Sequence, residues 1–403
     1  MLFQHFTFKN GKTAKNRFFK SAMEEQLAKH NQPTAQLVRL YDKWAKGGAG
    51  VLVTGNVMVA DNGKGSINDV VLSDERSMDT LKAWAKAGTQ NDTLLIMQIN
   101  HAGKQSPKVV NAKPVAPSAV ALQGMDGFIN PPRKLADNEI EMLIRQFAHT
   151  AQIAEKAGFS GVQIHGAHGY LISQFLSPHH NRRTDKWGGS LENRMCFLVE
   201  IYHAIRAVVQ PEFLVGLKLN SADFQKGGFD ESDSIQVVQK MSELGIDFIE
   251  ISGGNYESPE MLTAKASTQK REAFFLDYAE KARAVSQVPL IITGGFRSES
   301  AMNEALNSGH LDLVGVARPL ALMPDLPKQI QNGTYRTITT ERIKTGCKVV
   351  DNKVGAVLEM DWYMEQMALI GQGKQPDPEL SPWKVLLKAV WANGKAGLST
   401  GRS

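Results

Sequence analysis

The sequence has few cysteines and no long apolar run. Only Cys196 and Cys347 are cysteines among 403 residues, and they form neither a Cys-x-x-Cys pair nor the Cys/His spacing typical of a zinc or iron-sulfur site. No stretch approaches the roughly eighteen uninterrupted apolar residues of a transmembrane helix, and the first residues lack the basic and apolar regions of a secretory signal. These absences argue against a zinc ribbon, an iron-sulfur cluster and membrane insertion, and we expect a cytoplasmic protein in a reducing environment.

The basic residues do not gather into a stripe. The chain carries 46 Lys and Arg against 41 Asp and Glu, a net charge of +5, and the positive charges are spread along its length. Nucleic-acid binding depends on clustered positive charge. We therefore expect no nucleic-acid partner. The expected partner is a small-molecule substrate. The tryptophans of the C-terminal region leave a homo-oligomer possible.

Short apolar runs alternate eight times with segments of helical periodicity. The expected strands are residues 18–23, 50–55, 94–99, 161–164, 214–219, 247–251, 289–293 and 311–316. The clearest helices are residues 35–46, 77–87, 138–157, 191–209, 232–244 and 273–285, of which Ser190 can cap the fourth. Eight strand-helix units within about 300 residues predict an α/β fold, a closed parallel (β/α)8 TIM barrel.

Three segments lie outside this repeat. Residues 3–8 alternate apolar and polar side chains before Asn10-Gly11, which predicts an N-terminal hairpin cap over residues 1–14. Residues 101–137 are too long for an ordinary connection and predict a lid over a site, with a disordered insertion as the alternative. The barrel domain then spans residues 1–340. Residues 341–403 form a C-terminal extension that packs on the barrel or on a second subunit, or lies on a membrane surface.

Two histidines and a tyrosine follow the fourth expected strand. The run His165-Gly166-Ala167-His168-Gly169-Tyr170 places them where barrel enzymes keep their chemistry. Together these side chains can donate hydrogen bonds to a carbonyl oxygen and supply a proton. Two histidines three residues apart can also bind a metal, and a histidine beside glycine often only satisfies a backbone group. The catalytic, metal-binding and structural interpretations all remain open on these residues alone.

The seventh and eighth expected strands both end in glycine-containing turns. The first reads Thr293-Gly294-Gly295-Phe296 and the second Gly315-Val316-Ala317-Arg318-Pro319. Barrels bind phosphate in the loops after these two strands, because glycine lets backbone N–H groups approach the anion and an arginine adds a charge-assisted contact. The two turns predict a phosphate site without deciding between a cofactor and a substrate.

In combination these features resemble the flavin-dependent old yellow enzymes, a branch of the NADH:flavin oxidoreductases. The resemblance runs from about Lys15 to Pro327 and includes Lys15-Asn16-Arg17, residues 97–104 (MQINHAGK), residues 165–171 and residues 174–194 (QFLSPHHNRRTDKWGGSLENR). It implies a TIM barrel that binds FMN tightly across its mouth and is reduced by NADH or NADPH.

The resemblance also implies a role for individual residues around FMN. Gln98 hydrogen-bonds the pyrimidine edge of the isoalloxazine ring, and Lys218 faces N1 and the C2 carbonyl, where a cation stabilises the negative charge of the reduced ring. The backbone of Ala22 and Met23 passes along the flavin. The phosphate, now assigned to the cofactor, is held by Gly294, Gly295, Ala317 and Arg318.

The same resemblance assigns the histidine run to the substrate. His165 and His168 bind a carbonyl oxygen, and Tyr170 gives a proton to the α-carbon, so the implied activity is reduction of the activated C=C bond of α,β-unsaturated carbonyl compounds. The alternatives are a flavin-dependent dehydrogenase acting on another donor, a metal-dependent barrel hydrolase using His101, His165, His168 and an Asp, and a catalytically silent flavin or phosphate binder.

Glu24 departs from the pattern of the family. Relatives place Thr or Cys beside the flavin, whereas this chain reads Ala22-Met23-Glu24-Glu25. An ionised carboxylate there would make reduction of the ring harder, and a protonated one could donate a hydrogen bond. We expect Glu24 to contact the cofactor and tune it; the alternative is that Glu24 turns away to pair with a nearby cation.

Overall fold

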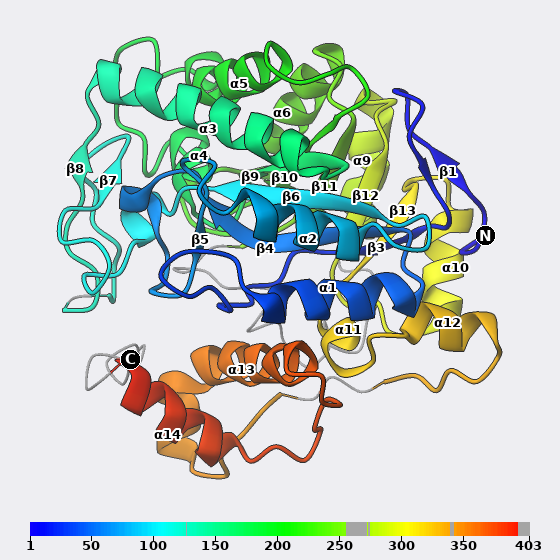
Figure 1. Cartoon of the computed structure of the whole chain (residues 1–403). Coiled ribbons are helices and arrows are strands. Elements are labelled where there is room, and N and C mark those ends of the chain that lie inside the picture. Colours follow the sequence, from blue (N-terminus) through cyan, green and yellow to red (C-terminus); the bar gives the residue numbers. More distant parts are fainter. Residues whose placement is uncertain (126, 255–271, 273–274, 339–341, 394–403) are drawn as a thin grey trace.

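Eight parallel strands close into a barrel at the centre of the computed structural model (Figure 1). The structure describes residues 1–403 except residues 126, 255–271, 273–274, 339–341 and 394–403. The barrel strands are β3 (Phe18–Lys20), β4 (Val51–Met58), β6 (Leu94–Asn100), β9 (Gly161–Gly166), β10 (Leu214–Asn220), β11 (Phe248–Ser252), β12 (Leu290–Thr293) and β13 (Leu313–Val316). The ring closes where β3 pairs with both β13 and β4, which confirms the expected (β/α)8 barrel. A short strand, β5 (Val70–Val71), lies outside the ring and pairs in parallel with the end of β4.

The first barrel strand is three residues shorter than expected. It ends at Lys20 because its neighbour β13 ends at Val316, whose carbonyl oxygen accepts the last ladder hydrogen bond from the Ser21 N–H at 3.0 Å. Residues 22 and 23 therefore lie outside the sheet, at the end of the barrel where the strands terminate.

Helices cover the outside of the barrel. They are α1 (Ala35–Gly47), α2 (Met78–Gly88), α3 (Asp137–Ala157), α4 (Leu171–Leu176), α5 (Leu191–Arg206), α6 (Glu231–Glu243), α9 (Leu276–Val285), α10 (Glu299–Asn307), α11 (Arg318–Leu322) and α12 (Leu326–Gln331). The expected cap of α5 is confirmed, since Ser190 Oγ accepts a hydrogen bond from the Asn193 N–H at 3.3 Å. The expected helix over residues 273–285 begins at Leu276, and residues 273–274 lie outside the described part of the chain.

The interior of the barrel changes from apolar to polar along its axis. Where the strands begin, a cluster of fully buried side chains fills it, including Phe8, Phe19, Val51, Ile96, Leu214, Phe248 and Leu313. Phe8 comes from the N-terminal hairpin of β1 (Phe6–Thr7) and β2 (Thr13–Ala14), and its ring centroid lies 6.0 Å from that of Phe248. A Cβ at Gly216 would lie 2.1 Å from the Phe248 ring, so glycine makes room for this ring. The hairpin thus closes one end of the barrel and leaves the other end for polar groups.

The segment between β6 and α3 is folded against the barrel. It contains a 3-10 turn, η2 (Gly103–Gln105), and two short paired strands, β7 (Val115–Ala116) and β8 (Arg133–Lys134). Lys104 is buried with its Nζ 2.9 Å from His180 Nδ1, and Gln105 Nε2 donates to the carbonyl oxygen of His168 at 3.0 Å. The base of this segment therefore contacts the loop that carries the histidine run.

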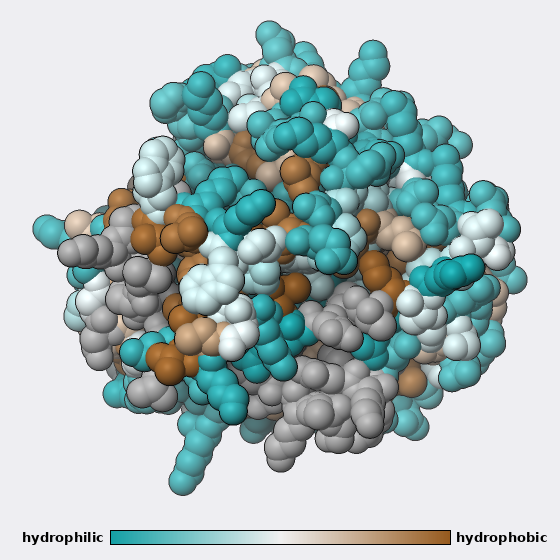
Figure 2. Space-filling view, turned by 90° about the horizontal axis from the view of Figure 1, so that it is seen from below, coloured by the Kyte–Doolittle hydropathy of each residue, from teal (hydrophilic) through white to brown (hydrophobic). Residues whose placement is uncertain are grey.

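Two helices of the C-terminal extension lie beneath α1 (Figure 1). Helix α13 (Lys348–Gly371) packs on α1, where Arg39 Nε donates to the Gly371 carbonyl at 2.7 Å, and α14 (Pro382–Asn393) packs on α13 through the Lys388–Glu365 ion pair at 2.6 Å. Seen from below, this face mixes hydrophobic and hydrophilic residues (Figure 2). The exposed large apolar side chains on the described parts of α13 and α14 are Val349, Met360, Trp383, Leu387 and Trp391. The described helices all lack the combined length and apolar character required to cross a membrane.

Candidate active site

The end of β9 brings His165, His168 and Tyr170 together. The His165 ring centroid lies 5.2 Å from that of His168 and 4.8 Å from that of Tyr170, both in edge-to-face arrangements. His168 adopts a left-handed backbone with φ of 60°, and its N–H donates to Asn220 Oδ1 at 3.2 Å. The side chain of Asn220 thus supports a backbone conformation that residues other than glycine rarely adopt. The three predicted site residues form one contiguous cluster at the polar end of the barrel.

Both histidines of the cluster are neutral at pH 7. Burial, together with the neighbouring His168 and Lys218, places the pKa of His165 well below its usual 6.5. Burial and the Lys218 charge lower the pKa of His168 to about 3. A neutral imidazole donates from one ring nitrogen and accepts at the other, so the neighbours of each ring decide what it offers to a substrate.

The neighbours of each ring assign its proton. His165 Nδ1 accepts a hydrogen bond from the Ala167 N–H at 3.3 Å, which leaves the ring proton on Nε2. His168 Nε2 lies 2.8 Å from Ser252 Oγ. When the serine hydroxyl donates to Nε2, the His168 proton is on Nδ1, and each of the two rings then retains one N–H donor. Sequence reasoning missed Ser252, the last residue of β11.

A row of buried polar side chains crosses the barrel interior at the level of His165. Gln98 Nε2 donates to Gln163 Oε1 at 2.7 Å, and Gln163 Nε2 donates to Glu250 Oε2 at 2.7 Å. Lys218 Nζ lies 3.1 Å from Glu250 Oε1, and the Thr293 hydroxyl donates to the same oxygen at 2.7 Å. The predicted flavin ligands Gln98 and Lys218 are therefore joined through side chains of two other strands.

Sequence reasoning missed Gln163 and Glu250 although a signal was present. Gln163 lies two residues before His165, on the same face of β9, and Glu250 stands beside Lys218 in the register of β10 and β11. Because side chains alternate between the two faces of a strand, a polar residue at an even spacing from an inward-facing one also faces the barrel interior.

The phosphate end of the predicted site lies after β12 and β13. Gly294 and Gly295 have φ values of 153° and 85°, which favour glycine. Arg318 begins α11, and its Nη1 donates to Glu359 Oε1 of α13 at 2.6 Å. Another residue that the sequence did not reveal, Glu359, thus contacts the predicted phosphate ligand from the C-terminal extension. The glycine backbone and the guanidinium suit a phosphate, and the amide of Gln98 and the ammonium of Lys218 suit a flavin ring.

Glu24 faces an amide. Its Oε2 accepts a hydrogen bond from Asn56 Nδ2 at 2.7 Å, and Asn56 Oδ1 accepts one from Asn100 Nδ2 at 3.1 Å. Burial and the nearby carboxylates of Asp69 and Glu25 raise the pKa of Glu24 well above its usual value. The nearby cation is instead paired with the next residue, since Lys20 Nζ lies 3.8 Å from Glu25 Oε1.

His101 is part of the packing. It is fully buried, its Nδ1 accepts from the Gly103 N–H at 3.0 Å, and its Nε2 lies 3.3 Å from Asn62 Oδ1. Across the residues that the structure describes, no three His, Cys, Asp or Glu side chains gather in a way that could hold a metal ion. The metal-dependent hydrolase alternative therefore finds no ligand set in this part of the chain.

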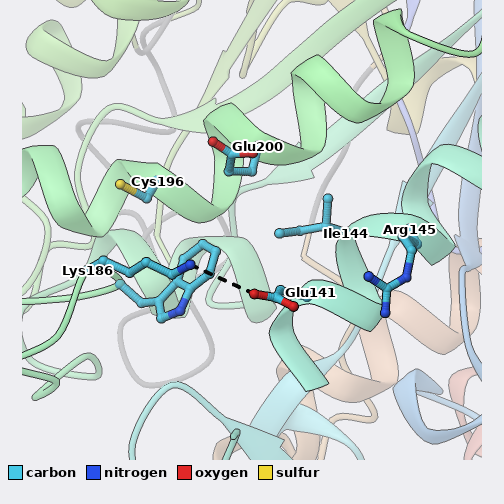
Figure 3. Close-up of a pocket in the computed structure, with 7 residues that line it drawn as sticks. Glu141, Ile144, Arg145, Lys186, Cys196 and Glu200 are labelled. Atoms are coloured by element: carbon cyan, nitrogen blue, oxygen red, sulfur yellow. Dashed lines mark ion pairs between the residues drawn. The ribbon is translucent and has the colours of Figure 1, made fainter. Parts of the chain in front are cut away.

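A surface pocket lies elsewhere, on the helical shell (Figure 3). It is lined by residues of α3, α5 and the connection before α5, namely Glu141, Ile144, Arg145, Lys186, Trp187, Cys196 and Glu200. Lys186 Nζ lies 3.8 Å from Glu141 Oε1 across it. None of the predicted site residues lines this pocket, so it does not belong to the candidate active site.

The chain is a TIM barrel with glycine turns and an arginine after its last two strands. An amide, an ammonium and paired histidines lie at the same end of the barrel. This combination is typical of a flavin-binding oxidoreductase. The chain belongs to the NADH:flavin oxidoreductase / NADH oxidase family, whose family model matches residues 1–337. FMN is accordingly the cofactor and NADH or NADPH the reductant, which confirms the cofactors that the resemblance implied.

Two relatives carry the same description, NADH-dependent flavin oxidoreductase iliE. The protein from Hypocrea jecorina (strain QM6a) is 39% identical over 352 residues, which cover 80% of this chain and 87% of the relative. The protein from Neonectria sp. (strain DH2) is 38% identical over 395 residues, which cover 90% of this chain but 51% of the relative. The chain thus spans about half the length of the Neonectria relative.

Two solved structures are similar to this chain in fold. A 2-naphthoyl-CoA reductase in complex with 2-naphthoyl-CoA superposes with a TM-score of 0.77 at 29% identity, over 82% of this chain and 52% of that chain. The old yellow enzyme homologue from Zymomonas mobilis superposes with a TM-score of 0.71 at 25% identity, over 85% of this chain and 94% of that chain.

Proposed function

We propose that this chain reduces the activated C=C bond of α,β-unsaturated carbonyl compounds. The observation that carries the proposal is the cluster of two neutral histidines and a tyrosine at the polar end of a flavin-family barrel, in which the ring centroids of His168 and Tyr170 lie 5.2 Å and 4.8 Å from that of His165. When bound, FMN reduced by NADH or NADPH supplies the hydride. The protein would hold it with Gln98 and Lys218 at the ring, with the backbone of Ala22 and Met23 and the carboxyl of Glu24 beside the ring, and with Gly294, Gly295, Ala317 and Arg318 at the phosphate.

The histidines bind the carbonyl oxygen of the substrate. Negative charge develops on this oxygen as the β-carbon accepts hydride, and fixed N–H donors stabilise this charge more than they stabilise the neutral carbonyl. The low pKa of His168, about 3, keeps its ring uncharged across the physiological range. His165 Nε2 and His168 Nδ1 are the two donors that the hydrogen-bond partners of these rings leave for the substrate.

Tyr170 donates the proton to the α-carbon. Tyr170 is only 8% exposed, and its ring centroid lies 4.8 Å from that of His165, so its ring is held beside the carbonyl-binding histidines. A positioned general acid of this kind contributes about 10²- to 10⁴-fold to the rate. The loss of its hydroxyl removes the proton donor and leaves hydride transfer from NADH to the flavin unaffected.

The first test is the visible spectrum of the purified protein. We expect a yellow protein that NADH or NADPH bleaches under anaerobic conditions and that cyclohexenone or maleimide reoxidises. Tyr170→Phe should slow the reoxidation by at least about 100-fold and leave the bleaching rate unchanged. Tyr202→Phe is the matched control, since Tyr202 donates to the Leu244 carbonyl at 3.1 Å and is not part of the histidine cluster. Equal reoxidation rates for wild type and Tyr170→Phe would remove the proton-donor role, and a colourless protein with stoichiometric zinc would overturn the function.

A further inference from the structure

The buried row from Gln98 to Lys218 has a fixed direction. Gln98 is 2% exposed, Gln163 and Glu250 are 0% exposed and Lys218 is 3% exposed, so these side chains contact one another away from solvent. The only acidic member is Glu250, which forms an ion pair with Lys218. Its position in the row decides which atom every other member presents.

A carboxylate has acceptors and no donors. Gln163 must therefore turn its NH2 group toward Glu250, and the carbonyl oxygen of its amide then faces Gln98. Gln98 in turn uses its NH2 group toward Gln163, which leaves Oε1 as its acceptor. The carboxylate of Glu250 on β11 thus fixes the orientation of the Gln163 amide, which in turn fixes that of the Gln98 amide on β6. The two hydrogen bonds join residues 87 and 65 positions apart in the sequence.

We propose that Glu250 is a positioning residue that sets the hydrogen-bonding polarity of the FMN-binding edge through this relay. The inference rests on the FMN placement proposed above. The pyrimidine edge of a flavin carries one donor, N3–H, between the C2 and C4 carbonyl oxygens. Gln98 Oε1 is the acceptor that N3–H requires, and the Lys218 ammonium is a donor for the C2 carbonyl and N1. One carboxylate orients both groups.

Neighbouring donors reinforce this role of Glu250. The Thr293 hydroxyl donates to Glu250 Oε1 at 2.7 Å and lies 2.7 Å from the Ser21 hydroxyl. Thr293 immediately precedes Gly294, so the same carboxylate also contacts the end of β12 from which the phosphate loop begins. A glutamine at position 250 would place an NH2 group against one of the three donors, Gln163, Lys218 or Thr293, and would allow the relay to reverse.

The relay is tested by reconstituting the protein with FMN labelled with ¹⁵N at N3. We expect Glu250→Gln and Gln163→Leu each to shift the bound N3 signal toward that of a weaker hydrogen bond and to raise the FMN dissociation constant about tenfold, the effect of one well-placed hydrogen bond. The double variant should match the single variants, because both changes interrupt one relay. Asp247→Asn is the matched control: Asp247 precedes the same strand and pairs with Arg206 at 2.6 Å, and its loss should leave the N3 signal in place.

Several outcomes would overturn the relay. An unchanged N3 signal in Gln163→Leu would do so, as would additive shifts in the double variant. Gln163→Leu retains the Lys218–Glu250 ion pair and so decides the question even if Glu250→Gln does not fold. Gln98→Leu and Lys218→Gln test the underlying placement separately: if both leave the FMN dissociation constant unchanged, FMN does not bind at this edge.

Discussion

Replacing Ser252 with alanine should slow alkene reduction, because the ring proton of His168 would no longer be held on one nitrogen. The Ser252 hydroxyl lies 2.8 Å from His168 Nε2. When this hydroxyl donates to Nε2, the ring proton of His168 is on Nδ1. Without it, a buried ring nitrogen loses its partner at a cost of about 1–3 kcal/mol, and the form that donates to the substrate oxygen is no longer favoured. This cost corresponds to a rate of alkene reduction lower by about 5- to 150-fold.

The assay is stopped-flow reoxidation of the reduced protein by cyclohexenone. Ser160→Ala is the matched control: this serine is also buried, and its Oγ accepts from the Leu95 N–H at 3.1 Å, but it lies just before β9, at the opposite end of the barrel. Ser160→Ala should keep the wild-type rate if it folds. If Ser252→Ala reoxidised as fast as wild type, or if Ser160→Ala slowed equally, Ser252 would have no specific role in orienting His168.

Two further predictions concern pKa values. The pKa of Glu24 is raised by burial and by Asp69 and Glu25, so its carboxyl ionises as the pH rises. The flavin potential of the wild type should then fall more steeply with pH than that of Glu24→Gln. Equal slopes in spectroelectrochemical titrations would contradict a tuning role. Burial lowers the pKa of His101 to about 3, so between pH 6.5 and pH 3 the unfolded chain binds the extra proton and stability falls as the pH falls. From pH 7 to pH 5 the free energy of unfolding should fall by about 2 kcal/mol less in His101→Gln than in wild type, as measured by urea denaturation; an identical fall would show that His101 is not buried in its neutral form.

The barrel strands could be predicted from sequence because strands buried on both faces are continuous apolar runs. The runs around Val51, Leu94 and Leu214 identify strands before any long-range contact is known. The end of β3 could not be predicted in this way, because residues 22 and 23 continue its apolar pattern. Its length is set by β13, a strand almost 300 residues away in the chain.

In the candidate site too, residues close together in the sequence could be predicted, and those that meet through long-range pairing could not. His165, His168 and Tyr170 are neighbours in sequence, so one loop brings them together and the sequence reveals them. Two further residues lie on another strand: Ser252, which contacts His168, and Glu250, which contacts Lys218. They reach these partners only through the register of the closed barrel. Contacts of this kind depend on the sheet as a whole, and a single sequence does not reveal which polar residues will meet.

The pairing of β3 with β13 has a consequence for synthesis. The first barrel strand emerges from the ribosome early, but its second neighbour, Leu313–Val316, is translated almost 300 residues later. Until then β3 presents an open strand edge, the kind of surface that pairs with other chains and aggregates. Low growth temperature and available chaperones should therefore increase the soluble yield of this chain more than stabilising substitutions in its surface helices.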